Sequence, residues 1–401
     1  MNKDYYNIPF SLQCIVREWL YVLGYVFFSY FVYGKSRNPV PDVVFYCGYG
    51  NMPGNKPWDG TSLSRGIGGA ESCVIHLAQE LARDNLQVVI YCDCNVEKTC
   101  ESGVVYKPST QFDYKTTYTT IILWRYPFAA GFISAKKKIG WLHDPGIMIL
   151  FDIVHRSWVL QRIYGWWIRD TIWVVPSQYM KKRCEPYVSV LHIPNGVPVH
   201  PTLSTELVSP IATSFVDQRR KNSFVWHTNL NRGLEDLIAA FPTVLQEFPD
   251  AHLFVCNEPC FYIHTRAEKI MRDIQQDFIT YMGLLSHQET LDLLRKTDFF
   301  CYPASIPESF SLCSWEAAAN GCIPFLYDSG ALNELSESVS NRGVLPDHHI
   351  VPVGQMETLI DRVMYLMRHP DEKERIRVSM QRKTSLGWNP ISKQWKEQFH
   401  M

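Results

Sequence analysis

The stretch that decides the fold is residues 306–332, IPESFSLCSWEAAANGCIPFLYDSGAL. Residues 315–319 are mostly good helix formers, and Asn320-Gly321 is a typical helix stop because both residues tolerate the left-handed conformation. Residues 322–327 then have the apolar character of a buried strand. A helix followed directly by a buried strand is the repeating unit of a parallel α/β sheet.

Two carboxylates lie on either side of the start of this helix. Ser309 and Ser311 can each cap an N-terminus, and with Ser311 as the cap the amides from Leu312 onward are unpaired and favour an anion such as phosphate. Glu308 precedes that end and Glu316 follows it, roughly 10 Å away at ~1.5 Å of rise per residue. This exceeds the ~5 to 9.5 Å of a glycosidase pair. The spacing indicates separate tasks along an elongated ligand; the alternative is a capped core helix with two solvated acids.

The rest of the chain repeats the alternation of strand and helix, which predicts two Rossmann-like, doubly wound α/β domains facing a central cleft. Helices are expected at 69–83 and 232–248, and a capping box at Ser286 and Glu289 opens another that runs to Arg295. The expected strands are 42–47, 87–91, 120–124, 138–142, 171–175 and 190–194, then a second set from Ser223 with 251–256, 278–282, 298–302 and 322–327.

Length and composition agree with this division. The 401 residues exceed one ordinary core. We expect an aromatic N-terminal segment at 1–40, a first domain at 41–200, a linker at 201–221 with its basic run 219–221, and a second domain at 222–384. The net charge of −1 points to no nucleic-acid partner.

Residues 19–33, WLYVLGYVFFSYFVY, form an uncharged aromatic run. It is shorter than the ~20 residues of a spanning helix, and its four tyrosines suit an interface. We expect it to pack on the first domain or to lie on a membrane surface, with a short signal anchor as the alternative. The expected location is cytoplasmic, at the cytosolic face of a membrane if the segment binds lipid.

The 12 cysteines are scattered and do not show the paired spacing of a zinc site. Many lie inside expected strands, where a free thiol behaves as a small hydrophobe. We therefore expect neither a disulfide framework nor a structural metal.

Three further features are candidates for the cleft. A long glycine-containing loop at 48–67 precedes Gly68-Gly69, and glycines let backbone amides approach a phosphate. His143 and Asp144 follow an expected strand. Arg232 opens an expected helix, where a cation opposes the helix dipole unless an anion lies beside it. A surface loop, a structural histidine and a solvated arginine are the respective alternatives.

These pieces together resemble the retaining glycosyltransferases of family 4, which have the two-domain GT-B fold and use nucleotide-activated sugars. The match covers about residues 42–399, and its most specific part is the Glu, seven residues, Glu signature. The motifs that carry it are PESFSLCSWEAAANGCIP at 307–324, GIGGAE at 66–71, WLHD at 141–144, PNGV at 194–197, NRGLEDLIAAFP at 231–242 and GLLSHQETLDLLRKTDFFCYPAS at 283–305.

For the donor, the resemblance implies that Glu308 faces the sugar, with the amides of Phe310 and Ser311 at its hydroxyls. It places the amide of Leu312 on the diphosphate and Glu316 on the ribose hydroxyls. The remaining implied donor contacts are the backbone of Leu284 at the base and Gly68 and Gly69 over the phosphates.

His143 would contact the sugar from the first domain, and Arg232 would neutralise the leaving diphosphate. Glu71, Arg125 and Asp144 are the acceptor candidates on the first domain. The resemblance also implies that a final helix, at about 385–401, returns to the first domain.

The implied reaction moves a hexosyl group from a UDP- or GDP-sugar to a hydroxyl of a glycan, glycolipid or glycoprotein, with retained configuration and without a metal or other cofactor. The absence of an Asp-x-Asp motif agrees. A non-catalytic nucleotide-sugar binding protein and a GT-B phosphorylase or epimerase are the alternatives.

Two departures from the family pattern affect the site. Trp226-His227-Thr228 and Arg232 stand where many relatives carry an arginine and a lysine, so one phosphate cation is missing or is supplied from elsewhere in the chain. Ser311 occupies a position that is often glycine, where its side chain either crowds the sugar or adds a hydrogen bond.

Overall fold

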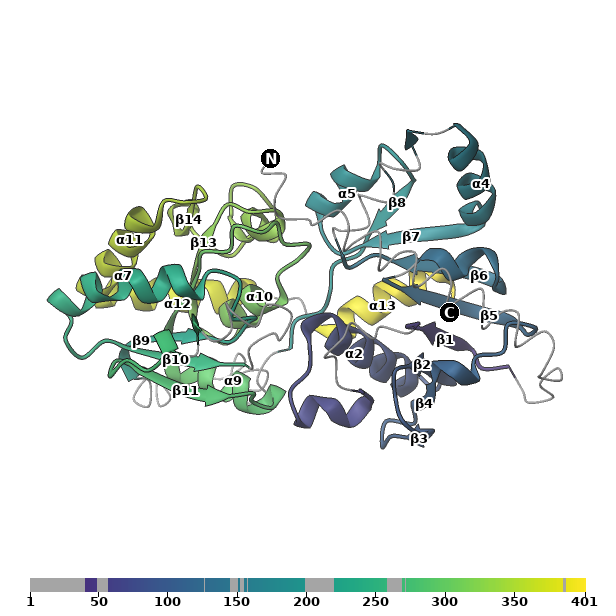
Figure 1. Ribbon diagram of the computed structural model, residues 1–401, viewed down its shortest axis with the longest axis horizontal. Coiled ribbons are helices and arrows are strands. Elements are labelled where there is room, and N and C mark those ends of the chain that lie inside the picture. The colour runs from purple at the N-terminus through teal and green to yellow at the C-terminus, as the bar shows by residue number, and fades with distance from the viewer. Residues whose placement is uncertain are drawn as a thin grey trace. The chain divides into compact units, whose positions relative to one another are not determined.

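The structure is a computed structural model that describes residues 40–48, 57–125, 127–144, 151, 155–156, 158–198, 220–257, 269–270, 272–384 and 387–401. The aromatic segment 19–33 and linker residues 201–219 lie outside this set. The described residues divide into two compact units (Figure 1). Unit 1 contains the described residues up to Thr61, then 70–194 and 388–401, and unit 2 contains 62–69 and the described residues of 195–387.

Unit 1 is built on an eight-stranded sheet in the order β3-β4-β2-β1-β5-β6-β7-β8. Only the β3–β4 pair is antiparallel among the described strands. β1 is entirely buried, because each face of a parallel sheet is covered by crossover helices. The strands are β1 (Val43–Tyr46), β2 (Val88–Cys92), β3 (Lys98–Thr99), β4 (Val105–Pro108), β5 (Thr117–Trp124), β6 (Ser134–Trp141), β7 (Thr171–Val175) and β8 (Val190–His192).

The helices of unit 1 pack an apolar side on this sheet. In α2, Val74, Leu77 and Leu81 follow helical spacing and are fully buried. The helices are α2 (Gly69–Arg83), α4 (Trp158–Ile168), α5 (Gln178–Cys184) and α13 (Trp388–Phe399), with short 3₁₀ turns η2 (Ser109–Gln111) and η3 (Pro127–Gly131). A further 3₁₀ turn, η1 (Gly60–Ser64), begins in unit 1 and ends in unit 2.

The C-terminal helix α13 belongs to unit 1, although unit 2 lies between it and the rest of unit 1 in the sequence (Figure 1). Trp395 packs edge-on against Trp141 with the ring centres 5.0 Å apart. Lys396 pairs with Asp84, next to the end of α2. Buried aromatic packing of this kind contributes more than the exposed ion pair.

Unit 2 has a six-stranded, all-parallel sheet in the order β11-β10-β9-β12-β13-β14. The strands are β9 (Arg220–Trp226), β10 (His252–Cys256), β11 (Ile279–Gly283), β12 (Thr297–Tyr302), β13 (Ile323–Tyr327) and β14 (Ile350–Val351). The helices are α7 (Leu234–Glu247), α9 (His287–Lys296), α10 (Leu312–Ala319), α11 (Met356–Arg368) and α12 (Pro370–Lys383), with η5 (Ala331–Leu335) and η6 (Asp347–His349).

The predicted fold class is confirmed, because both units are parallel-sheet Rossmann-like domains. Two boundaries were wrong. The basic run does not belong wholly to the linker, since Arg220 starts β9 and its guanidinium lies 5.4 Å from the Phe254 ring centre. The helix expected from Arg232 begins two residues later, after Gly233, whose φ is 109°.

The packing of α12 onto the sheet depends on a buried ion cluster. Asp298 of β12 is almost completely buried and contacts Lys373 Nζ at 2.7 Å and Arg377 Nη2 at 2.6 Å. Arg377 Nε also donates to the carbonyl of Gly321, which follows α10. A buried carboxylate is tolerated here because two cations and the backbone amide of Asn222 surround it.

His349 makes the stability of unit 2 depend on pH. Its ring is fully buried against Phe325, and burial lowers its pKa to about 3. The unfolded chain binds a proton near pH 6.5 and the folded chain does not, so stability is lost as the pH falls from about 6.5 toward 3. Between pH 7 and pH 5, the free energy of unfolding in urea should fall by about 2 kcal/mol less for His349→Phe than for the wild type. An unchanged pH dependence would refute this role.

Within the described residues, no helix combines the length and the apolar character needed to cross a bilayer.

Candidate functional site

One carboxylate oxygen of Glu308 accepts hydrogen bonds from two side chains of unit 2, buried Tyr302 and half-buried Arg232. Tyr302, the last residue of β12, donates its hydroxyl to Oε1 at 2.6 Å. Arg232 Nη1 donates to the same oxygen at 3.2 Å. The arginine therefore has the anionic neighbour that its place before α7 requires.

The backbone of Glu308 is fixed by the loop that follows β13. Its carbonyl accepts from the amide of Ala331 at 2.8 Å, and its own amide donates to Ser329 at 3.4 Å. Gly330 lies between them with φ of 68°. A Cβ on Gly330 would lie 2.4 Å from the Glu308 carbonyl oxygen, so only glycine allows this approach.

α10 begins where expected, but Ser311 does not cap it with its side chain. Ser311 has the left-handed φ of 63°, and its hydroxyl bonds to Ser314 Oγ at 2.8 Å instead of to a helix amide. The left-handed backbone gives a physical reason for glycine at this position in related sequences. The Phe310 ring next to it is buried and stacks on Trp315.

Alanine usually stabilises a helix more than glycine does, but the left-handed backbone of Ser311 favours glycine at this position. Ser311→Gly and Ser311→Ala both lose the hydroxyl, but only alanine retains a Cβ in the left-handed region. We expect Ser311→Gly to be more stable than Ser311→Ala by about 1 kcal/mol in urea unfolding. Ala318→Gly, inside α10, is the control and should be destabilising. A Ser311→Ala variant as stable as Ser311→Gly would contradict the strain.

Glu316 has a separate set of partners. Its carboxylate lies 3.2 Å from Nε2 of His287, the first residue of α9. The capping box predicted at Ser286 and Glu289, which opens this helix, is confirmed. Burial alone would lower the pKa of His287, but the Glu316 charge and hydrogen bond raise it above its usual value. Burial lowers the pKa of nearby His227 to about 4. Glu316 thus shifts His287 toward its charged form, whereas burial keeps His227 neutral near neutral pH.

The loop residues 62–69 also belong to unit 2. A Cβ on Gly66 would lie 2.7 Å from Cγ of Leu284, and one on Gly69 would lie 3.5 Å from Leu312. The loop therefore approaches two of the predicted donor-binding positions. Leu284 itself is exposed after the end of β11.

The remaining predicted residues lie in unit 1: Glu71 in the first turn of α2, Arg125 directly after β5, and His143 and Asp144 shortly after β6. Arg125 Nη1 pairs with Glu71 Oε1 at 3.0 Å, and its guanidinium lies over the Trp124 ring. His143 is buried against Trp141, with ring centres 4.4 Å apart, while Asp144 is exposed.

His143 has the properties of a neutral hydrogen-bonding group. Burial, with the Arg125 charge beside it, lowers its pKa to about 3. Its Nε2 has no hydrogen-bond partner among the residues that the structure describes. A buried ring nitrogen without a partner is costly unless a ligand or water satisfies it.

The described residues contain no group of three or more histidine, cysteine or acidic side chains placed to hold a metal ion.

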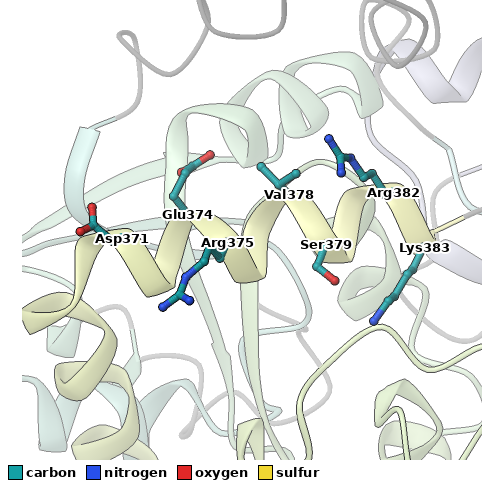
Figure 2. A pocket seen from close by; sticks show the side chains of 7 residues that line it. All are labelled: Asp371, Glu374, Arg375, Val378, Ser379, Arg382 and Lys383. Carbon is teal, nitrogen blue, oxygen red and sulfur yellow. The ribbon is translucent and has the colours of Figure 1, made fainter. Parts of the chain in front are cut away.

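A hollow of about 670 Å³ lies elsewhere, along α12 (Figure 2). Glu374, Val378 and Arg382 point to one side of this helix, and Arg375, Ser379 and Lys383 to the other (Figure 2). The lining contains none of the predicted site residues and mixes both charges on one helix. This hollow does not have the convergent polar groups of a donor site.

Sequence reasoning missed three residues of the site: Tyr302, His287 and Gly330. Tyr302 lies at the carboxyl end of a correctly predicted strand, a placement that could have identified it. Nothing in the local sequence distinguishes the role of Gly330, because its close approach to Glu308 depends on the tertiary fold.

Comparisons with known proteins agree with this geometry. Residues 214–382 match the family model of glycosyl transferases group 1. That range contains Arg232, Glu308 and Glu316. A search of curated protein sequences finds no significant match.

Several solved structures are similar in fold. Sucrose-phosphate synthase from Thermosynechococcus elongatus has a TM-score of 0.63 at 13% identity, covering 90% of this chain and 98% of that one. HepE from Anabaena, solved with UDP and glucose, has a TM-score of 0.62 at 15% identity, covering 90% and 99%. WaaG, a glycosyltransferase involved in lipopolysaccharide biosynthesis, has a TM-score of 0.58 at 10% identity, covering 88% and 98%.

The two-unit fold is therefore that of the GT-B class. Residues 214–382 are similar to the glycosyl transferases group 1, and this similarity supports the prediction of an enzyme of the glycosyltransferase class.

Proposed function

We propose that the protein is a retaining, nucleotide-sugar-dependent hexosyltransferase with its donor site on unit 2. The observation that carries this proposal is the fixed carboxylate of Glu308, held by Arg232 and Tyr302 in front of α10. The HepE structure contains UDP and glucose, which favours a UDP-sugar over a GDP-sugar as donor.

In this proposal the donor lies along the start of α10. Glu316 accepts the ribose hydroxyls, and Leu284 lies beside the base. The amide of Leu312 and the loop residues Gly68 and Gly69 bind the diphosphate.

The sugar lies at Glu308, with the amides of Phe310 and Ser311 at its hydroxyls. Donors fixed before the reaction stabilise charge that develops in the transition state better than mobile water does.

Arg232 has two roles in the proposed reaction. In the ligand-free chain it neutralises Glu308, and with donor bound it also faces the departing diphosphate. The bond between the anomeric carbon and the phosphate oxygen breaks, and a bond to the acceptor oxygen forms on the same face. The acceptor proton passes to the departing phosphate oxygen, so no second carboxylate beside Glu308 is needed.

The acceptor site is proposed on unit 1, at Glu71, Arg125 and Asp144, with His143 as a neutral contact for the sugar. The Glu71–Arg125 pair presents both a hydrogen-bond acceptor and donors, which suits a polyhydroxyl acceptor. We propose a glycan, glycolipid or glycoprotein hydroxyl as this acceptor. WaaG, which acts in lipopolysaccharide biosynthesis, makes a lipid-linked glycan a first candidate to assay.

The test is nucleoside diphosphate release from a panel of UDP- and GDP-sugars, with and without chelator. Release from one donor that persists with chelator would support the proposal, including its independence of metal. Binding without release for every donor and acceptor would favour the non-catalytic alternative. Strict dependence on inorganic phosphate would favour a phosphorylase.

A further inference from the structure

The carboxylate of Glu308 has unequal surroundings at its two oxygens. Oε1 accepts two hydrogen bonds, from Tyr302 at 2.6 Å and from Arg232 at 3.2 Å. Oε2 has no partner among the described residues. The side chain is 17% exposed, so part of it faces outward from unit 2.

Tyr302 is suited to hold that carboxylate permanently. Its ring is fixed between Trp226, at 5.6 Å and edge-on, and Phe300, at 5.4 Å and stacked. Burial, together with the Glu308 charge, raises the pKa of its hydroxyl well above the usual value, so it stays protonated. A neutral hydroxyl that donates to a carboxylate makes a short, strong hydrogen bond.

The backbone of Glu308 cannot adjust to compensate for the loss of that bond. Ser329 and Ala331 bind its amide and carbonyl, and Gly330 leaves no room for movement toward the loop. The main chain and one carboxylate oxygen are therefore both fixed before any ligand arrives.

We propose that Tyr302 is a positioning residue, which holds Glu308 so that Oε2 alone accepts a hydrogen bond from a hydroxyl of the donor sugar. This inference rests on the proposed function and deepens it. With Oε1 saturated by two donors, Glu308 orients the sugar and stabilises positive charge on it; it is not the attacking group.

The test is a double-mutant cycle with Tyr302→Phe and Glu308→Ala. Tyr302→Phe removes one oxygen atom and retains the packing on Trp226 and Phe300. We expect turnover to fall about tenfold, on the scale of one lost hydrogen bond to a charged group, with the affinity for UDP unchanged. In the Glu308→Ala background the same change should have no further effect on turnover, because its only target is gone.

Tyr365→Phe is the matched control. Its hydroxyl also donates to a carboxylate, Glu372 Oε2 at 3.0 Å, but on the exposed surface of α11. This variant should retain wild-type turnover. Equal thermal unfolding of the Tyr302→Phe variant and the wild type would exclude misfolding as the cause of lost activity.

The outcomes separate this inference from the proposed function. A wild-type protein that neither binds nor turns over any nucleotide sugar would overturn both. An active wild type with unaffected Tyr302→Phe turnover would overturn only the role of Tyr302. If Tyr302→Phe lowered turnover equally in the wild-type and Glu308→Ala backgrounds, the role of Tyr302 would also be overturned, because its hydroxyl would then act on a group other than Glu308.

Discussion

Glu308→Gln should lower turnover at least about 100-fold, the scale on which one preorganised electrostatic contact acts in a transition state. Glutamine retains the size of the side chain but removes the negative charge that faces the sugar. It also weakens the contacts with Tyr302 and Arg232. The measurement is kcat with the preferred donor at saturating acceptor.

Glu337→Gln is the control for this prediction. Glu337 is an acid of the same unit that pairs with Lys383 on the surface at 2.6 Å. An exposed pair of this kind contributes little, so this variant should match the wild type. If Glu308→Gln kept more than about a tenth of wild-type turnover, the electrostatic role assigned to Glu308 would be wrong.

Asp298→Ala should destabilise unit 2 by about 3–5 kcal/mol, because it leaves Lys373 and Arg377 buried without their shared anion. The loss would loosen α12 from β12 and free the guanidinium that also binds the carbonyl of Gly321. The change in the free energy of unfolding is measured by urea denaturation monitored by circular dichroism.

Glu374→Ala provides the comparison. It removes the other carboxylate that contacts Arg377, but this one is partly exposed, so a loss below about 1 kcal/mol is expected. Stability of Asp298→Ala within about 1 kcal/mol of the wild type would show that the cluster is not needed to hold α12.

Much of the fold could be predicted because the strands of parallel sheets are buried on both faces. Uninterrupted apolar runs such as 171–175 therefore identify them, and β7 matches that range. Short or polar elements gave no such signal. β4 was missed because VYKP has neither an apolar run nor strict alternation, and Pro108 argues against a strand.

The candidate site was predictable in its residue types but not in its partners. Sequence spacing placed Glu308 and Glu316 on either side of a helix start, and they indeed have different partners. The family resemblance assigned Arg232 to a diphosphate, whereas in the structure its guanidinium binds the Glu308 carboxylate. Contacts of this kind connect β12, the turn before α7 and the loop after β13, and local sequence carries no information about which side chains meet there.

Ser311 shows how a departure from a family pattern becomes physically interpretable. A serine at a frequent glycine position indicated either crowding or a new hydrogen bond. The structure contains both a left-handed backbone and a hydroxyl bond to Ser314.

The central claim is that the two acids act at different ends of one nucleotide sugar, and calorimetric titration of UDP and of the UDP-sugar tests it most directly. The account predicts that Glu316→Gln weakens both ligands, because both contain the ribose. Glu308→Gln should weaken the UDP-sugar and leave UDP unaffected. Equal weakening of UDP by both variants, or loss of UDP affinity through Glu308→Gln alone, would contradict the account.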